Sequence, residues 1–362
     1  MNGDRKVKIG EGAGGELMQR MLKELVIPFV RRSSGGEDRE GVPPELLDDS
    51  AVIDNVAFTI DGHTVWPLEF PGGDIGSLSV FGTVNDLWVV GARPKALALS
   101  MVIEEGTDKE LLRRISGSIG IASERAHVTV VTGDTKVVEK GGVKGMVITT
   151  AGIGEMHPAL QRNFERASEL RSKRGARSPV SRWLRDDAVR EGDIIILSGS
   201  VGDHGISLLS FREGYGFETD LVSDLAPMGE VIEAALDVGG VIAAKDLTRG
   251  GLANGLNEWC SKSGCSILVR ESDIPVKEAV SSACDMLGFD PFEIGNEGKV
   301  ILAVAPGSED EVLKAIRRTE AGKDAAVIGI VGPEGKNVIL QTVVGGKRIM
   351  DPPYGDPVPR IC

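Results

Sequence analysis

Carboxylate side chains recur at glycine-flanked turns along much of the sequence. The stretches DDSAV, TIDGH, PGGDIG, TVNDL, TGDTK and AAKDLTRGG contain Asp48, Asp49, Asp61, Asp74, Asp86, Asp134 and Asp246. Each of these taken alone is an ordinary turn or capping aspartate. Magnesium is held in proteins by a few carboxylates together with phosphate oxygens. The whole set therefore favours a site for a magnesium–nucleotide complex.

Asn85 and Asp86 differ from the other polar residues in their surroundings. They lie inside SVFGTVNDLWVVG, where most neighbours are apolar. Burying an amide and a carboxylate there is costly unless each finds a partner. A divalent cation would supply one.

Two further residues could handle phosphate and protons. In TGDTK, Lys136 follows a β-branched stretch, so its ammonium could reach a phosphate as a point charge. In IGNEGK, Glu297 lies on a glycine-flanked turn that precedes the apolar stretch VILAVA. A carboxylate held there could be a general base, and a plain turn residue explains it equally well.

The glycine-rich stretch GEGAGG, residues 10–15, has the spacing of a dinucleotide-binding loop. The preceding KVKI is short and charged, and no β-α-β unit closes within about 30 residues, which disfavours that fold. A phosphate contact at a helix N-terminus and a mobile turn both remain open. No Walker A sequence occurs.

Four cysteines are present, and the last residue, Cys362, ends the stretch DPVPRIC. Cys260, Cys265 and Cys284 have apolar neighbours and no zinc-type spacing, so we expect buried, reduced thiols. The prolines near Cys362 favour an extended arm.

Composition limits the function classes. The formal net charge of −13 argues against nucleic acid or an anionic membrane as the main partner. No signal-like or membrane-length apolar stretch occurs, so a cytoplasmic protein is expected.

The chain divides by character into an N-terminal domain (1–157), a basic segment (158–185), a layered α/β domain (186–340) and a mobile tail (341–362). The basic segment has eight Arg or Lys against two Glu. It is favoured as a solvated linker helix, with docking to an acidic partner as the alternative.

Local patterns predict the main elements. Helical spacing of apolar residues predicts a helix over 16–27, ended by Pro28, and another over about 77–90. TDKE at 107–110 and SEDE at 308–311 are expected to open helices as capping boxes. Strands are expected at HVTVVTGD, GMVITTAGIG, DIIILSGS, VIAAKD, CSILV, VILAVA, AAVIGIV, NVILQTVV and KRIM.

These stretches together resemble one family. DDSAV, TIDGHTV, FPGGDIG, GTVNDL, GARP, TGDTKVV, GDHG, DLTRGGLA, GNEGK and PRIC stand in the collinear order of the HypE family of hydrogenase maturation proteins. The resemblance covers nearly the whole chain. It departs at Glu11, where the family usually carries histidine, and the segment 158–185 and the loop 33–41 are longer than expected.

The resemblance implies a two-domain, PurM-like α/β (α+β) fold. Its N-terminal β-sheet pairs across a homodimer, and ATP with Mg²⁺ binds between the domains. It implies catalytic roles for Cys362, Lys136 and Glu297. It also implies a metal site and a nucleotide site, the first made by Asp49, Asp86 and Asp246 and the second by Asp49, Asp61, Asp74, Asn85, Asp134 and Arg249.

The family's chemistry is the ATP-dependent dehydration of a carbamoyl group on the final cysteine, giving a thiocyanate that supplies cyanide to hydrogenase iron. HypF is the expected carbamoyl donor and the HypC–HypD complex the acceptor. Arg360 is expected to favour the Cys362 thiolate, whereas the terminal carboxylate opposes it. Two alternatives stay open, namely a related enzyme acting on a diffusible substrate and a non-catalytic nucleotide-binding scaffold.

Overall fold

The computed structural model describes residues 6–12, 15–30, 42, 46–173, 181–214, 220–355, 358 and 361–362. The loop at 33–41, part of the basic segment, part of the GEGAGG stretch and Arg360 lie outside the described residues.

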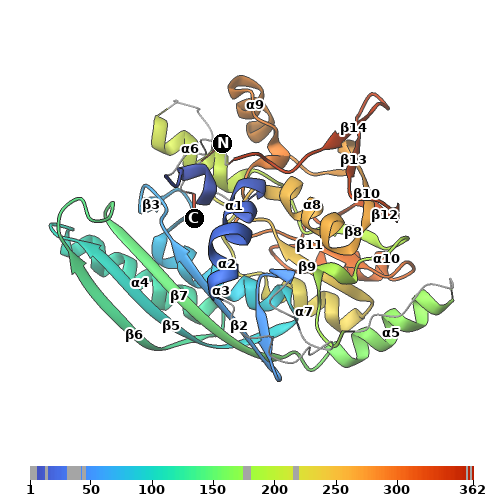
Figure 1. Ribbon diagram of the computed structural model, residues 1–362, viewed down its shortest axis with the longest axis horizontal. Coiled ribbons are helices and arrows are strands. Elements are labelled where there is room, and N and C mark those ends of the chain that lie inside the picture. The colour runs from blue at the N-terminus through green and yellow to red at the C-terminus, as the bar shows by residue number, and fades with distance from the viewer. Residues whose placement is uncertain are drawn as a thin grey trace.

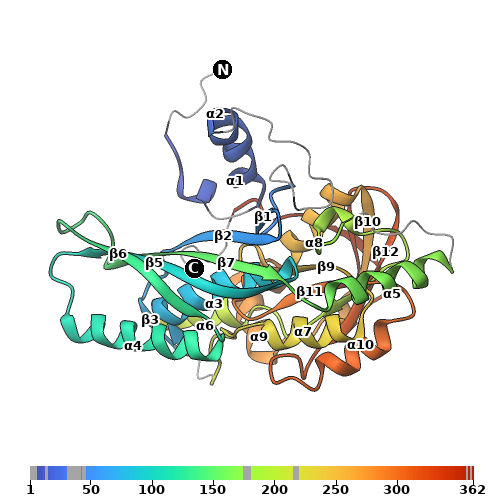
Figure 2. The ribbon, with the colours of Figure 1, turned by 90° about the horizontal axis from the view of Figure 1, so that it is seen from below.

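The N-terminal part is built on a five-stranded sheet with the order β1-β2-β7-β5-β6. Strands β5 and β6 are parallel, and the other neighbours are antiparallel. The strands are β1 (Ala51–Ile53), β2 (Val56–His63), β5 (Ala92–Glu104), β6 (Thr129–Val138) and β7 (Met146–Met156). Helices α3 (Ile75–Val89) and α4 (Lys109–Arg125) lie against one face of this sheet, as Figure 2 shows.

Helix α3 is the element that joins the two halves of the molecule. It follows the hairpin of β3 (Glu69–Phe70) and β4 (Gly73–Asp74), and Asp74 caps it by accepting a 2.8 Å hydrogen bond from the Ser77 N–H. Gly91 follows the helix with φ 85°, a conformation that glycine adopts without strain. Nearly all of α3 is buried, because the sheet covers one side and the C-terminal part the other.

The C-terminal part contains a seven-stranded sheet with the order β14-β13-β10-β12-β8-β11-β9 (Figure 1). Its strands are β8 (Ile194–Leu197), β9 (Val241–Asp246), β10 (Cys265–Arg270), β11 (Val300–Val304), β12 (Ala326–Glu334), β13 (Val338–Gln341) and β14 (Lys347–Met350). Its helices are α5 (Leu160–Ser172), α6 (Asp203–Glu213), α7 (Gly229–Val238), α8 (Gly251–Ser263), α9 (Glu278–Leu287) and α10 (Glu309–Ile316). Short 3₁₀ turns are η4 (Asp186–Ala188), η5 (Glu271–Asp273) and η6 (Pro291–Glu293).

Strand β11 shows how the second sheet is buried on both faces. Val300, Leu302 and Val304 point into the core shared with α7, α10 and the N-terminal part. Ile301 and Ala303 point into a second core with α8. A fully buried aliphatic side chain contributes roughly 1.5–3 kcal/mol, so this two-sided packing holds the sheet firmly in place.

The described part of the basic segment forms the predicted helix, α5, but one face of this helix is buried and not solvated as expected. Asn163 of α5 is fully buried and hydrogen-bonds both the N–H and the carbonyl of Val241 at 2.7 Å. Arg171 is also buried, where it pairs with Asp193. A basic side chain can pack inside a fold when a buried carboxylate faces it.

The N-terminal helix also differs from the expectation. Helix α1 (Gly15–Met21) continues through the π-helical turn η2 (Leu22–Val26) into α2 (Ile27–Val30), so Pro28 does not end it. The first turn, η1 (Ile9–Gly12), precedes this helix. Pro28 lies in the first turn of the α2 segment, directly after the π-helical turn, and proline is tolerated in the first turn of a helix.

Capping was predicted at the right places with partly wrong chemistry. Helix α4 is capped by Asp108, whose carboxylate accepts from the Glu110 N–H at 3.0 Å, and not by the Thr107 box. Ser308 precedes α10 but its hydroxyl donates to the Ala305 carbonyl instead of capping the helix.

The tail after β14 lies on the protein. The Pro353 carbonyl packs so closely on Gly15 that a Cβ there would come within 2.4 Å of it. Val358 and Ile361 are buried at 0% and 2% exposure. Cys260, Cys265 and Cys284 are buried free thiols, as predicted. Among the described helices, none has the length and apolar character needed to cross a membrane.

Candidate active site

A cavity of about 210 Å³ lies where β2 and α3 meet the loops that follow β9 and precede β11. Its walls contain most of the residues that the sequence marked for chemistry. They are Asp49, Thr59, Ile60, Asp61, His63, Gly82, Asp86, Asp246, Thr248, Arg249, Glu297 and Cys362.

The cavity holds carboxylates that repel one another. Burial raises the pKa of Asp86 well above its usual value, and the charges of Asp61, Asp246 and Asp49 raise it further. The pKa of Asp246 is raised for the same reasons, first by burial and then by Asp49. The Thr59 hydroxyl donates to Asp86 Oδ2 at 2.9 Å. A cation in this space would relieve the repulsion.

Glu297 faces the cavity with an oxygen that has no partner. The residue is 3% exposed, and its Oε1 makes no hydrogen bond within the described structure. Burial, then Asp246 and Asp224, raise its pKa well above the usual value. Its backbone N–H donates to Asp224 Oδ1 at 3.0 Å, which fixes the turn. Gly298 allows this approach, since a Cβ there would lie 1.9 Å from the Asp224 carbonyl oxygen.

Cys362 lies in the same cavity, in contact with Arg249. The guanidinium of Arg249 is hydrogen-bonded to residue Cys362, and its electrostatic interaction with this terminal residue is the largest cause that raises the pKa of Arg249. The Thr64 N–H and hydroxyl donate to the Cys362 main-chain oxygen at 3.1 and 3.2 Å. The tail therefore rests inside the site, which the sequence could not indicate.

A buried ionic cluster borders the cavity, and the sequence analysis missed it. Lys245 is 5% exposed and pairs with Asp49 at 2.7 Å, Glu258 at 3.0 Å and Asp186 at 3.4 Å. Lys262 pairs with Asp186 at 2.6 Å. The one available signal was a lysine at the end of the apolar strand VIAAKD.

Four of the predicted residues do not line this cavity. Asp74 is the α3 cap. Asn85 is buried as expected, but it donates to the Ala226 carbonyl at 3.1 Å and accepts from the Met228 N–H at 2.8 Å. Asp134 and Lys136 stand exposed on β6 and pair with each other at 3.4 Å.

The described part of the GEGAGG stretch is used locally. The Glu11 carboxylate accepts from the Lys8 N–H at 2.7 Å, and Gly15 gives room to the tail at Pro353.

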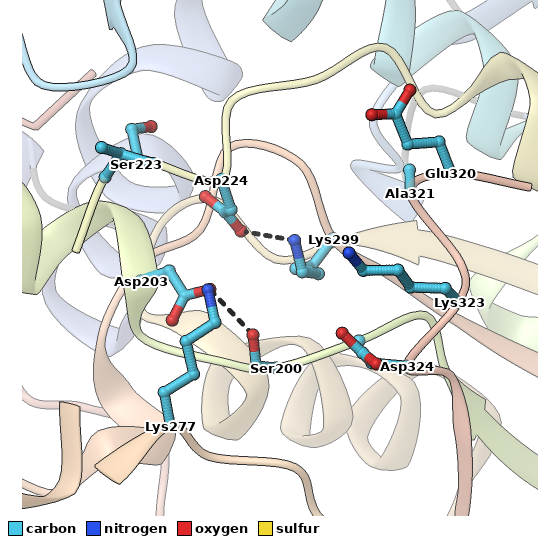
Figure 3. Close-up of a pocket in the computed structure, with 12 residues that line it drawn as sticks. Ser200, Asp203, Ser223, Asp224, Lys277, Lys299, Glu320, Ala321, Lys323 and Asp324 are labelled. Atoms are coloured by element: carbon cyan, nitrogen blue, oxygen red, sulfur yellow. Dashed lines mark hydrogen bonds and ion pairs between the residues drawn. The ribbon is translucent and has the colours of Figure 1, made fainter. Parts of the chain in front are cut away.

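A second cavity, of about 160 Å³, lies in the C-terminal part (Figure 3). Asp203 pairs there with Lys277 at 2.7 Å, and Asp224 pairs with Lys299 at 3.2 Å. Because Asp224 also holds the Glu297 backbone, this cavity lies directly behind the turn that carries Glu297.

Among the described residues, no group of three or more Asp, Glu, His or Cys side chains is already arranged to hold a metal ion. The cavity nevertheless fits Mg²⁺, because magnesium usually takes one or two carboxylates and completes its shell with water and phosphate oxygens. The carboxylates of Asp61, Asp86 and Asp246, which line this one cavity together, are the observation that supports the fit.

The two halves match two family descriptions. Residues 47–156 match the N-terminal domain of AIR synthase related proteins, and residues 190–341 match the C-terminal domain. The chain is thus a two-domain protein of the AIR synthase related, PurM-like class, and the predicted α/β (α+β) fold class is confirmed.

Full-length relatives narrow the assignment. A putative hydrogenase expression/formation protein of Methanocaldococcus jannaschii is 45% identical, covering 99% of this chain and 100% of the relative. Carbamoyl dehydratase HypE of Azotobacter vinelandii is 40% identical, covering 98% and 97%. The chain belongs to the HypE family.

Solved structures agree with this membership. A HypE–HypF complex matches with a TM-score of 0.79 at 35% identity, covering 93% of this chain and 99% of the solved one. HypE in complex with ATP matches with a TM-score of 0.76 at 35% identity, covering 99% and 100%.

Proposed function

We propose that this protein is an ATP-dependent carbamoyl dehydratase that turns an S-carboxamide on Cys362 into an S-thiocyanate during hydrogenase maturation. The observation that carries the proposal is the place of Cys362, which lines one cavity with Arg249, Glu297 and the aspartates. Curated relatives at 36–40% identity bear the name carbamoyl dehydratase HypE.

The chemistry needs an activated oxygen. Water is a poor leaving group from an amide, whereas phosphate leaves readily once the amide oxygen has taken the γ-phosphoryl group of ATP. The balance is RSC(O)NH₂ plus ATP⁴⁻ giving RSCN, ADP³⁻, HPO₄²⁻ and one H⁺. The C–O bond breaks, and the nitrogen loses both of its protons.

Chain residues divide this work. Arg249, hydrogen-bonded to Cys362, is placed to orient the carboxamide or stabilise charge on its oxygen. Glu297, with its unpartnered oxygen, is the proposed base that takes an N–H proton. Tethering the substrate to Cys362 replaces a bimolecular encounter by an intramolecular one.

The nucleotide and metal would be held by the aspartates of the cavity. Asp49, Asp86 and Asp246 are the proposed Mg²⁺ ligands, and Asp61 and Arg249 line the same space for nucleotide contacts. Magnesium, when bound, neutralises the phosphate charge during transfer. Asp74 and Asn85 have structural partners, so any part they play is in fixing α3.

A homodimer is proposed from the face of the N-terminal sheet that lies opposite α3 and α4. Phe58 and Ile60 on β2 and Ile153 on β7 are 42%, 61% and 43% exposed there, which is unusual for neighbouring apolar side chains. We take the occupant to be a second copy. Asp134 and Lys136 on the open edge strand β6 would then act in the cavity of that copy.

Two further partners follow from the reaction. A carbamoyl donor of the HypF kind must load Cys362, and a HypE–HypF complex is among the similar solved structures. The HypC–HypD complex is the proposed acceptor of the cyanide.

Intact mass tests the function. The protein carbamoylated on Cys362 is expected to lose the mass of one water when Mg-ATP is added, with one ADP formed. A Cys362→Ala variant taken through the same carbamoylation must show neither change. ATP binding without ADP formation would instead support a scaffold, and turnover that survives loss of Cys362 would support a diffusible substrate.

A further inference from the structure

Ile361, the residue before Cys362, is packed closely against the protein next to the cavity. Ile361 is 2% exposed, and a Cβ on Gly295 would come within 2.6 Å of its Cδ1. This close packing of Ile361 therefore requires a residue without a Cβ at position 295. Val358, three residues earlier, is fully buried as well.

A buried histidine is hydrogen-bonded to the backbone of Ile361. His204, in the first turn of α6, is 0% exposed, and its Nε2 lies 2.8 Å from the Ile361 carbonyl oxygen. A carbonyl can only accept, so Nε2 must carry the proton and donate it. The tip of the tail is thus held through its main chain.

The other ring nitrogen explains why this tautomer is stable. His204 Nδ1 lies 2.7 Å from Ser223 Oγ, and the same Oγ accepts from the Leu225 N–H at 3.1 Å. The Ser223 hydroxyl proton is therefore free to be donated to Nδ1. Ser223 also lines the second cavity (Figure 3). The ring of Phe70 packs edge-on against the His204 imidazole, with 5.5 Å between the ring centroids, and holds the plane of the imidazole.

We propose that His204 is a positioning residue that holds the Cys362 carrier inside the cavity. It contacts the carbonyl of residue 361 and not the thiol, so its hydrogen bond is the same whether the sulfur is free, carbamoylated or cyanated. The Ser223–His204–Ile361 chain thereby sets how often the thiol is exposed for loading and how often it stands beside Glu297. The catalytic consequence rests on the proposed function, but the positioning does not.

Alkylation of Cys362 by iodoacetamide, followed by intact mass, measures the exposure of the tip without any nucleotide. Two variants make the test specific. In His204→Gln the amide nitrogen can stand near the place of Nε2 and keep the donor. In His204→Asn the amide stands near Nδ1 and the donor to Ile361 is lost. The buried Cys260, Cys265 and Cys284 are internal controls.

We expect His204→Asn to react at Cys362 roughly three- to tenfold faster than the unsubstituted protein, the range of one net hydrogen bond. His204→Gln should stay within about twofold. With carbamoylated protein, His204→Asn should slow the loss of water by a similar factor and leave Mg-ATP affinity unchanged. A failure of water loss in every protein, with the alkylation pattern intact, would count against the proposed function only.

Equal alkylation rates in the unsubstituted protein and in His204→Asn would overturn the proposal. Thermal unfolding checks the fold. If His204→Asn is destabilised as a whole, Ser223→Ala decides, because it keeps the ring but removes the donor that fixes its tautomer. Unchanged Cys362 reactivity in a folded Ser223→Ala protein would then overturn the proposal.

Discussion

The Lys245 ammonium and the Asp49 carboxylate meet at 2.7 Å, across the boundary between the two sheets. Asp49 precedes β1, whereas Lys245 lies in β9 of the second sheet. The pKa of Lys245 is raised well above its usual value, because Asp186, Asp49 and Glu258 outweigh the effect of burial. One lysine thus stays charged and compensates carboxylates from three separate segments, which fixes Asp49 at the rim of the cavity.

Lys245→Met is expected to destabilise the protein by about 3–5 kcal/mol, because it leaves the buried Asp49 carboxylate without its cation, whereas Asp186 keeps Lys262. The free energy of unfolding from a denaturant titration measures this. The matched control is Lys95→Met, which removes an ammonium that pairs with Glu155 while half exposed. That change should cost at most about 1 kcal/mol. Equal losses for both variants would show that the cluster around Lys245 is not held together by charge.

The elements that the sequence predicted well are those set by local pattern. The β-branched stretch VILAVA is β11, and apolar spacing located α3. The burial of Asn85 also followed from its apolar neighbours, and it is 3% exposed. Its partners did not follow, because the backbone of residues 226–228 lies more than 140 positions away in the chain.

The errors that concern buried residues came from interactions between distant segments. Arg171 looked solvated because local charge counts do not contain Asp193, which lies beyond the end of the basic segment in the sequence. The sequence alone identified the cavity residues Asp49, Asp61, Asp86 and Asp246, because they lie in motifs that occur in the same order as in the HypE family. Lys245 and His204 were not marked as site residues, because a single buried polar residue acquires meaning only from the partners that the fold supplies.

Glu297→Gln is expected to slow the loss of water from the carbamoylated protein by roughly 10²–10⁴-fold, the range of general base catalysis. The amide keeps the shape of the side chain but takes no proton. Rapid-quench mass measurement with saturating Mg-ATP gives the rate. Glu293→Gln, which changes a glutamate outside the cavity lining, is the control. If the two variants react at the same rate, another group removes the proton.

Asp86→Asn should affect the free and the loaded protein in opposite directions. Without ligand it removes a carboxylate that Asp61, Asp246 and Asp49 repel, so the unfolding midpoint should rise or stay unchanged. With Mg-ATP at about 100 times its Kd the unsubstituted protein should gain about 2.7 kcal/mol, and the variant should lose most of this gain. Asp237→Asn, on the surface of α7, should behave like the unsubstituted protein. If Mg-ATP stabilises the Asp86→Asn variant as much as the unsubstituted protein, Asp86 is not a ligand of the metal.

Phe58→Glu should convert a dimer into a monomer. The side chain is 42% exposed on the face of the N-terminal sheet opposite α3 and α4, where a charge would be buried against a second copy. Light scattering coupled to size exclusion measures the mass. Met286→Glu is the matched control, because Met286 is 74% exposed on α9, away from this face. A dimer that tolerates Phe58→Glu would place the contact elsewhere.

A mixing experiment with a Lys136 variant tests whether two copies of the chain contribute residues to each active site. Lys136→Ala and Cys362→Ala proteins should each be inactive alone, the first for lack of the phosphate contact and the second for lack of the carrier. If Lys136 acts in the cavity of the second copy, unfolding and refolding a mixture gives heterodimers with one complete site. Random pairing then restores about a quarter of the sites. Loss of water from the carbamoylated mixture, followed by intact mass, measures this. A mixture that stays inactive although heterodimers form, seen with a mass tag on one variant, would show that Lys136 acts within its own chain or not at all.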